Sequence, residues 1–198
     1  MMQNRGKLII VAGPSGVGKG TIENAILKKF PDMHFSVSVT TRPKRDYEIE
    51  GQHYFFISKS DFKARIAAGE LVEWQEVYSK NGHLYGTLKS YIDQALEGDQ
   101  VLLLDLDIKG GINVKKAYPE DSISIFIEPP SPDALETRLI KRGTDSPEQI
   151  RIRLERMPEE MELGKQFDHQ IVNSNLDEAV DAFTHILEQE VYHQQRSI

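Results

Sequence analysis

The sequence of 198 residues contains no cysteine. Disulfide bonds, thiolate nucleophiles and cysteine-ligated zinc sites are therefore excluded. Long apolar runs are also missing, because Leu8–Ala12 near the start is far too short to cross a membrane, and no small-residue cleavage site follows it. We therefore expect a cytoplasmic protein that does not bind a membrane.

Basic residues are fewer than acidic ones, 24 against 31, which gives a formal net charge of −7. This balance argues against a general nucleic-acid-binding protein, which is usually basic overall, but it permits a local arginine cluster at an anionic ligand. Hydrophobic residues make up 39% of the chain, which is enough for a packed core. The length fits one domain with small inserted regions and indicates no oligomeric state.

Strand-like and helical segments alternate along most of the chain. Four apolar runs are typical of parallel strands buried on both faces: Lys7–Ala12, Val101–Leu104, Ser122–Ile127 and Gln170–Val172. Helical patterns cover Lys19–Phe30, Leu88–Leu96, Gly111–Ala117, Pro132–Lys141, Pro147–Lys165 and Leu176–Tyr192. The alternation predicts an α/β fold, in which helices cover both faces of a parallel sheet.

Two stretches interrupt this alternation. The first is Phe35–Tyr85, which we interpret as an insertion after the first strand and helix. Its predicted elements are strands at His53–Phe56, Leu71–Val77 and His83–Tyr85, and a helix at Ser60–Ala68 with Ser60 as its N-cap. The second interruption is the charge-rich stretch Lys141–Arg156.

The stretch Leu8–Thr21, LIIVAGPSGVGKGT, runs from a buried strand through a glycine loop into a helix. Gly13, Gly18 and Lys19 fit the spacing G-x-x-x-x-G-K, which cradles nucleotide phosphates with backbone N–H groups and a helix N-terminus. Gly20 occupies the place where a Ser or Thr hydroxyl usually helps to hold magnesium, and a threonine follows one step later. A ligand-free glycine turn is the alternative, but the lysine and the flanking strand and helix argue against it.

Hydroxyl groups lead into two arginines in the segment Phe35–Arg45, FSVSVTTRPKR. Arg42 and Arg45 carry planar guanidinium groups, which suit bidentate contacts with phosphate. Tyr54, in an aromatic strand, adds a hydroxyl donor. The alternative is a solvated basic loop.

A carboxylate stands beside the only tryptophan, at Glu73, and Tyr85 and Thr87 follow it. A carboxylate accepts hydrogen bonds from a ring N–H and an adjacent exocyclic amine, and guanine presents this pair on one edge. These residues could therefore line a base pocket. The alternative, a half-buried strand with Glu73 facing water, is favoured when this segment is taken alone.

Asp105 and Asp107 follow directly after the apolar run Val101–Leu104. Ligands of open parallel sheets bind beyond the carboxyl ends of the strands, and alternation places both acids on the same side. Acids beside a phosphate loop can hold hydrated magnesium or contact a ribose.

Six basic residues gather in and before the second interruption: Arg138, Lys141, Arg142, Arg151, Arg153 and Arg156. An arginine-bearing flap that closes over a triphosphate would stabilise charge during phosphoryl transfer and exclude water. The alternative is helical pairing with acids such as Glu148 and Glu155, which we expect to account for some of these residues.

A resemblance to the guanylate kinase family extends over about residues 7–183. It rests on eight segments in the same order: GPSGVGKGT, FSVSVTTRPKR, GQHYFF, LVEW, LYGT, LLLDLDIKGG, RLIKRGT and FDHQIVN. The resemblance implies one domain, 1–198, with a P-loop NTPase-like core (1–34, 88–140 and 160–198), an inserted GMP-binding region (about 35–87) and a mobile lid (about 141–159). It also implies in-line transfer of the γ-phosphoryl group of ATP to GMP, and to dGMP, with Mg²⁺, in purine nucleotide metabolism.

The resemblance also assigns the site residues. The ATP-binding residues would be Gly13, Pro14, Ser15, Gly16, Val17, Gly18, Lys19, Gly20 and Thr21, with Asn173 near the adenine. The GMP-binding residues would be Ser38, Arg42, Arg45, Tyr54, Glu73, Tyr85, Thr87 and Asp105. The catalytic residues would be Lys19, Arg42, Arg142 and Arg153, and Asp105 and Asp107 would hold Mg²⁺ through water.

Two positions depart from the family pattern. Gly20 removes the usual hydroxyl ligand of magnesium, and Lys109 stands where the family often has glutamine. The Gly-Lys-Gly-Thr ending of the loop also permits another nucleoside monophosphate kinase, such as adenylate kinase. Glu73 and Thr87 favour guanine over adenine.

A second alternative is a kinase-like domain that has become a protein-binding module. Such modules usually lose the loop lysine or the lid arginines. Lys19, Arg142 and Arg153 are all present, so the sequence favours an enzyme.

Overall fold

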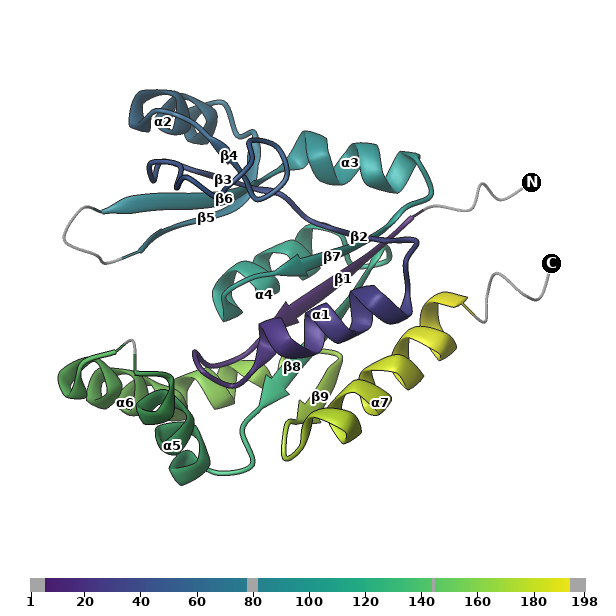
Figure 1. Cartoon of the computed structure of the whole chain (residues 1–198). Coiled ribbons are helices and arrows are strands. Elements are labelled where there is room, and N and C mark those ends of the chain that lie inside the picture. The colour runs from purple at the N-terminus through teal and green to yellow at the C-terminus, as the bar shows by residue number, and fades with distance from the viewer. Residues whose placement is uncertain (1–5, 78–81, 144, 193–198) are drawn as a thin grey trace.

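The computed structural model describes residues 6–77, 82–143 and 145–192 (Figure 1). Its elements are β1 Lys7–Ala12, α1 Lys19–Lys29, β2 Met33–Phe35, β3 Ser38–Thr40, β4 Tyr54–Phe56, α2 Lys59–Ala67, β5 Leu71–Val77, β6 His83–Leu88, α3 Lys89–Glu97, β7 Val101–Asp105, α4 Ile108–Ala117, β8 Ser122–Glu128, α5 Pro132–Arg142, α6 Pro147–Gly164, β9 His169–Val172 and α7 Leu176–Leu187, followed by a π-helical turn at Glu188–Tyr192. None of the helices in these ranges is long and apolar enough to cross a membrane.

Five parallel strands form the main sheet, in the order β2-β7-β1-β8-β9. The central strand β1 pairs with β7 on one side and with β8 on the other, so that Ile9 lies between Leu103 and Ile123. Because all five strands run the same way, the segments that follow β1, β7 and β9 leave the sheet at the same edge. This edge is where the glycine loop and the acids after β7 meet.

Alternate residues of β1 face opposite sides of the sheet. Ile9 and Val11 pack into a cluster with buried residues of α1, α5, α6 and α7, whereas Leu8 and Ile10 pack with α3 and α4. A strand buried on both faces explains why its sequence is a continuous apolar run. The predicted α/β fold, a parallel sheet with helices on both faces, is confirmed.

The insertion forms a second sheet of four strands, in the order β4-β3-β6-β5. Its own small core contains the fully buried Phe62 of α2, together with Val39, Leu71 and Leu84. Figure 1 shows this sheet and α2 in the upper part of the view, apart from the main sheet. The acceptor-side candidates Glu73, on β5, and Tyr85, on β6, therefore sit on a separate unit.

Helices α5 and α6 pack against each other (Figure 1). In this view they lie below the main sheet, and the insertion lies above it. Ser131 caps α5 by accepting a hydrogen bond from Ala134 N, and α6 begins with a capping box between Ser146 and Gln149. Each cap satisfies backbone donors that the first turn of a helix leaves free. The sequence therefore sets where the two helices begin, and with them where the lid arginines project.

Two predicted helix starts are wrong. The N-cap of α2 is Ser58, whose Oγ accepts from Asp61 N, and Ser60 lies inside the helix. Helix α4 begins at Ile108 rather than at Gly111, because the Asp107 side chain caps it by accepting from Gly110 N at 2.6 Å. In both cases a Ser or Asp side chain that precedes the predicted start accepts a hydrogen bond from the first turn of the helix.

The sequence did not predict β2 and β3, and it did not distinguish the two kinds of helix that make up the last helical segment, Leu176–Tyr192. Each of these strands has three residues, which is too short to show a periodic pattern. Helix α7 ends at Leu187, and the π-helical turn continues to Tyr192. Neither difference moves a predicted site residue to another part of the sheet.

We expect Gly164→Ala to lower the free energy of unfolding by about 1–3 kcal/mol, the usual cost of overpacking a core. A Cβ at Gly164, the last residue of α6, would lie 2.3–2.6 Å from ring atoms of the fully buried Phe126. Gly20→Ala in α1 is the matched control, because no atom lies within 4 Å of a Cβ there. Chemical denaturation of both variants measures the difference, and equal unfolding midpoints would contradict it.

Candidate active site

The loop between β1 and α1 has a backbone that favours glycine. Gly16 and Gly18 have φ angles of 88° and 103°. A Cβ on Gly18 would lie 2.6 Å from Asn173 Nδ2, and a Cβ on Gly16 would lie 2.6 Å from Leu139 Cδ2. Helix α1 begins at Lys19 with no side-chain cap and no acid in its first turn. Its positive end is therefore available to an anion.

Lys19 projects from the start of α1 toward the end of β7. Its Nζ donates to Gly13 O at 3.2 Å and lies 3.6 Å from Asp105 Oδ1. Glu23, one turn further along α1, is buried, and its Oε1 has no hydrogen-bond partner among the described residues. Burial raises the pKa of Glu23 above its usual range, and the charge of Asp105 adds to this shift. Burial beside another acid therefore favours the uncharged form of Glu23.

Two side chains from distant segments hold the backbone of the loop. Asn173 Nδ2 donates to Val17 O at 2.8 Å, and Arg138 Nη1 donates to the same oxygen at 3.1 Å. Arg138 Nη2 also donates to Asn173 O at 2.7 Å, which links α5 to the segment after β9. The buried Asn173 thus supports the loop, and its contact with adenine stays a prediction.

Glu73 on β5 is only 7% exposed, so the alternative in which it faces water is wrong. Thr87 Oγ1, on the paired strand β6, donates to Glu73 Oε1 at 2.6 Å. Burial raises the pKa of Glu73 to about 7; the Thr87 bond opposes this shift and the nearby Asp107 adds to it. A buried carboxylate with one oxygen fixed by a hydroxyl is a directed acceptor for a polar ligand.

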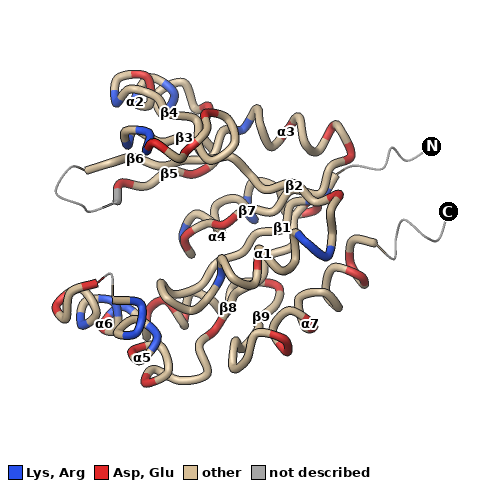
Figure 2. Tube along the Cα trace, in the orientation of Figure 1, with Lys and Arg blue, Asp and Glu red and all other residues tan. Residues whose placement is uncertain are grey.

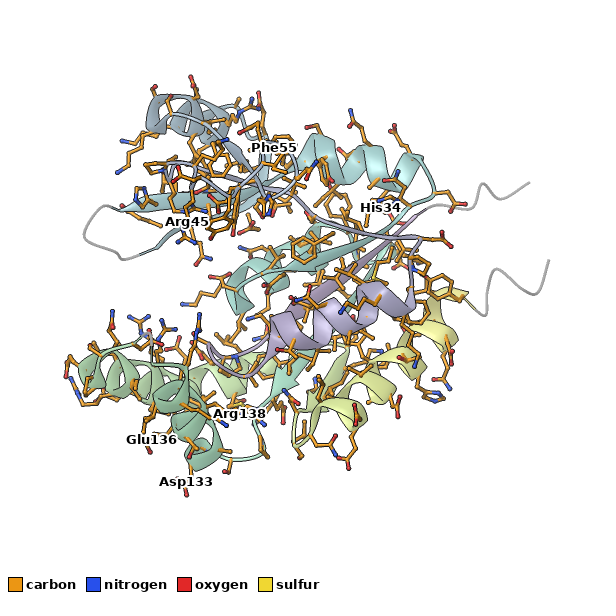
Figure 3. All side chains as sticks on the ribbon, in the orientation of Figure 1. His34, Arg45, Phe55, Asp133, Glu136 and Arg138 are labelled. Carbon is orange, nitrogen blue, oxygen red and sulfur yellow. The ribbon has the colours of Figure 1, made fainter. Side chains whose placement is uncertain are left out.

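Arg42 contacts two tyrosines of the insertion, Tyr54 and Tyr85. Its Nε donates to Tyr85 Oη at 3.3 Å, and its Cζ lies 5.3 Å from the centroid of the Tyr54 ring. Both terminal nitrogens bind Glu48, at 2.6 and 2.9 Å, so the fork expected to bind phosphate is already engaged. Arg45 is exposed, and Figure 3 shows it on the side of the insertion that faces α5 and α6.

One arginine of the predicted lid reaches the glycine loop. Arg153 Nη1 donates to Ser15 Oγ, and its Nη2 lies 3.1 Å from Asp145 Oδ1. This chain of contacts joins α6 to the loop that we predict to hold phosphate. Arg153 therefore contacts the glycine loop directly, through the side chain of Ser15.

Three further residues of the basic cluster differ in their surroundings. Arg142 and Arg156 line the cleft described below, whereas Arg151 binds Glu148 at 2.7 Å and also binds Glu155. Helical pairing therefore accounts for Arg151, as the alternative predicted. Figure 2 shows the blue Lys and Arg positions gathered where α5 meets α6.

A cleft of about 1390 Å³ brings most of the predicted site together. Its lining includes the whole loop Gly13–Thr21 and also Ser38, Tyr54, Glu73, Tyr85, Asp105, Asp107 and Arg142. Five predicted site residues do not line it: Arg42, Arg45, Thr87, Arg153 and Asn173. Of these, Arg42, Thr87, Arg153 and Asn173 each bond to a residue that does.

Comparison with known proteins decides the family. The family model for guanylate kinase matches residues 5–190. The chain belongs to the guanylate kinase family. It is a nucleoside monophosphate kinase, an ATP:GMP phosphotransferase.

Individual guanylate kinases match over most of their length. The guanylate kinase of Symbiobacterium thermophilum is 48% identical over 176 residues, which cover 89% of this chain and 82% of that one. The guanylate kinase of Thermotoga maritima is 40% identical over 186 residues, or 94% of this chain and 88% of that one. The crystal structure of guanylate kinase from Anaplasma phagocytophilum superposes with a TM-score of 0.73 at 29% identity, covering 96% of this chain and 88% of that one. The resemblance drawn from the motifs is confirmed.

The acids of this guanylate kinase fit a hydrated magnesium ion. No group of three or more acidic or histidine side chains among the described residues could hold a metal on its own. Mg²⁺ usually takes one or two carboxylates together with substrate phosphates and keeps several waters. Asp105 and Asp107 line the same cleft as the loop, and no atom lies within 4 Å of a Cβ at Gly20. The space of the missing hydroxyl is thus open to a hydrated ion.

Three residues of this guanylate kinase site had no predicted role. The sequence could have indicated Glu23, because it follows Lys19 by four residues and therefore lies on the same face of the helix. Arg138 was recognised only as part of a basic cluster, and its contact with Val17 joins residues 121 positions apart. Glu48 lies in an irregular loop, where no periodic pattern could have indicated it.

Proposed function

We propose that this enzyme transfers the γ-phosphoryl group of ATP directly to GMP, with the loop Gly13–Thr21 holding the donor and the insertion holding the acceptor. The proposal divides the chain into a core (1–34, 88–140 and 160–198), a GMP-binding region (35–87) and a lid (141–159). The separate second sheet supports the GMP-binding region, and the proposed lid covers the end of α5 and most of α6.

One observation carries the proposal: the phosphate loop, Glu73 and Arg142 line a single cleft. Two nucleotides bound there would meet end to end, so the phosphoryl group need not pass through a covalent enzyme intermediate. The attacking group is a phosphate oxygen of GMP, which is already ionised and needs no strong general base. Catalysis then consists of positioning and charge neutralisation.

Charge neutralisation falls to groups on three sides of the transferred phosphoryl. Lys19 and the loop N–H groups would hold the outer phosphates of ATP, and Arg142 and Arg153 would offset charge from the lid. Asp105 and Asp107 would hold Mg²⁺ through water, and the ion supplies further neutralisation at the phosphates of ATP. Closure of the lid would keep water from hydrolysing ATP.

Recognition of the acceptor falls to the insertion. Glu73 would accept hydrogen bonds from the ring N–H and the exocyclic amine of guanine, with Thr87 fixing its orientation and Ser38 lining the cleft nearby. Arg42, Arg45, Tyr54 and Tyr85 would surround the GMP phosphate. We also propose that dGMP is accepted.

The cytoplasmic location and the absence of nucleic-acid binding remain proposals from the sequence.

A coupled assay of ADP production with a panel of monophosphates tests this function. We expect GMP to be phosphorylated with a kcat/KM about 100-fold above that of AMP, UMP or dTMP, since a buried acceptor left unpaired penalises the wrong base. We also expect dGMP to be turned over. Faster turnover of AMP would favour an adenylate kinase, and no turnover of any monophosphate would favour a protein-binding module.

A further inference from the structure

Glu48 is a buried carboxylate in an otherwise exposed loop. It is 5% exposed, whereas its neighbours Tyr47 and Ile49 are 66% and 51% exposed. A carboxylate leaves water only where other groups replace its hydrogen bonds. The loop is therefore folded around this side chain, although no predicted role requires it.

Three donors replace the water around Glu48. Arg42 Nη2 donates to Oε1 at 2.6 Å, Arg42 Nη1 donates to Oε2 at 2.9 Å, and Arg45 N donates to Oε2 at 2.7 Å. The bond from Arg42, the largest cause, lowers the pKa of Glu48 to about 2. Glu48 therefore stays charged at any working pH, and it contacts both arginines of the acceptor side.

The remaining contacts of Arg42 leave little of its guanidinium unused. Besides Glu48, its Nε donates to Tyr85 Oη and its Nη1 donates to Pro43 O at 2.9 Å. A guanidinium has five N–H groups, so among the described residues one N–H, on Nη2, is left. The rings of Tyr54 and Phe56 lie 5.3 and 5.6 Å from Arg42 Cζ and restrict its plane.

The same hydrogen bonds orient Tyr85. Its hydroxyl oxygen accepts from Arg42, so its own proton is free to be donated, and Tyr85 lines the cleft. One N–H of Arg42 and the O–H of Tyr85 thus form a pair of donors whose nitrogen and oxygen atoms are placed before any ligand binds. Donors fixed in advance lose less rotamer freedom on binding.

We infer that Glu48 is a positioning residue for the phosphoryl acceptor, and that it holds Arg42 so that this pair of donors meets the phosphate of GMP. The inference rests on the proposed function, which places that phosphate beside Arg42 and Tyr85. A competing role for Glu48 predicts the opposite change in GMP affinity. If Glu48 only occupied the terminal nitrogens of Arg42, removing its charge would free the arginine and strengthen GMP binding.

Calorimetric titration of GMP and of guanosine, which lacks the phosphate, tests the inference. We expect Glu48→Gln to weaken GMP binding about tenfold, the effect of one charged hydrogen bond, and to change guanosine binding less than about twofold. The matched control is Asp46→Asn, which removes an exposed acid two residues away and should change neither. The KM for ATP should also stay unchanged in both variants.

Each other outcome is informative. Tighter GMP binding by Glu48→Gln, unchanged binding, or an equal loss for GMP and guanosine would overturn the inference. In an Arg42→Gln background, Glu48→Gln should have no further effect, because Glu48 acts through Arg42. If Arg42→Gln itself leaves GMP binding unchanged, the acceptor assignment of the proposed function is wrong instead. Should Glu48→Gln melt early, Glu48→Asp replaces it: this variant keeps the charge but is one methylene shorter, so it should loosen the hold on Arg42 and still weaken GMP binding more than guanosine binding.

Discussion

Replacing Lys19 by alanine is expected to lower kcat about 10³-fold, the upper end of the cost of removing one donor that stabilises transition-state charge. Lys19 Nζ is already placed by Gly13 O and Asp105, on a helix whose positive end faces the cleft. Steady-state turnover of GMP with saturating ATP measures the loss.

The fold should survive this change. Lys19 contributes one partly exposed ion pair, which is worth about 0–1 kcal/mol, so the melting temperature should fall by no more than about 4 °C. Lys28→Ala, an exposed lysine on the same helix, is the control and should keep wild-type turnover. A Lys19→Ala variant that kept kcat within tenfold of the wild type would mean that ATP is held elsewhere.

The sequence predicted the fold wherever burial on both faces imposes one residue type. β1, β7 and β8 are rich in apolar residues because helices cover both of their faces, and the helices between them follow from the alternation. The three-residue strands β2 and β3 lack such a pattern, because too few side chains alternate to be noticed. Helix starts depended on which polar side chain reached the backbone, as at Ser58 and Asp107.

The site could be predicted where its functional residues are neighbours in the sequence. The glycine loop is one segment with its lysine, so its spacing alone indicates phosphate binding. The supports of the site are not contiguous: Asn173 and Arg138 reach Val17 across 156 and 121 positions. Glu48 is close to Arg42 in sequence, but its burial depends on how an irregular loop folds back. Tertiary structure, not pattern, decides such contacts.

Replacing Glu73 by glutamine is expected to raise the KM for GMP about 100-fold, within the range for losing charged hydrogen bonds, and to leave the KM for ATP nearly unchanged. A carboxylate accepts from both guanine donors, whereas an amide places its own NH₂ group against one of them. Glu70→Gln, an exposed acid just before β5, is the control for the charge change. Equal increases in both KM values would contradict a guanine contact.

The burial of Glu73 also predicts a pH dependence. Because burial raises the pKa of Glu73 to about 7, the carboxylate that accepts from guanine is lost as the pH falls through 7. About one tenth of Glu73 is ionised at pH 6 and about nine tenths at pH 8, so the KM for GMP should rise about tenfold between pH 8 and pH 6. The phosphate of GMP itself titrates near pH 6, so Glu73→Gln supplies the baseline. If the wild type and Glu73→Gln showed the same pH profile, the titrating group would be the ligand and not Glu73.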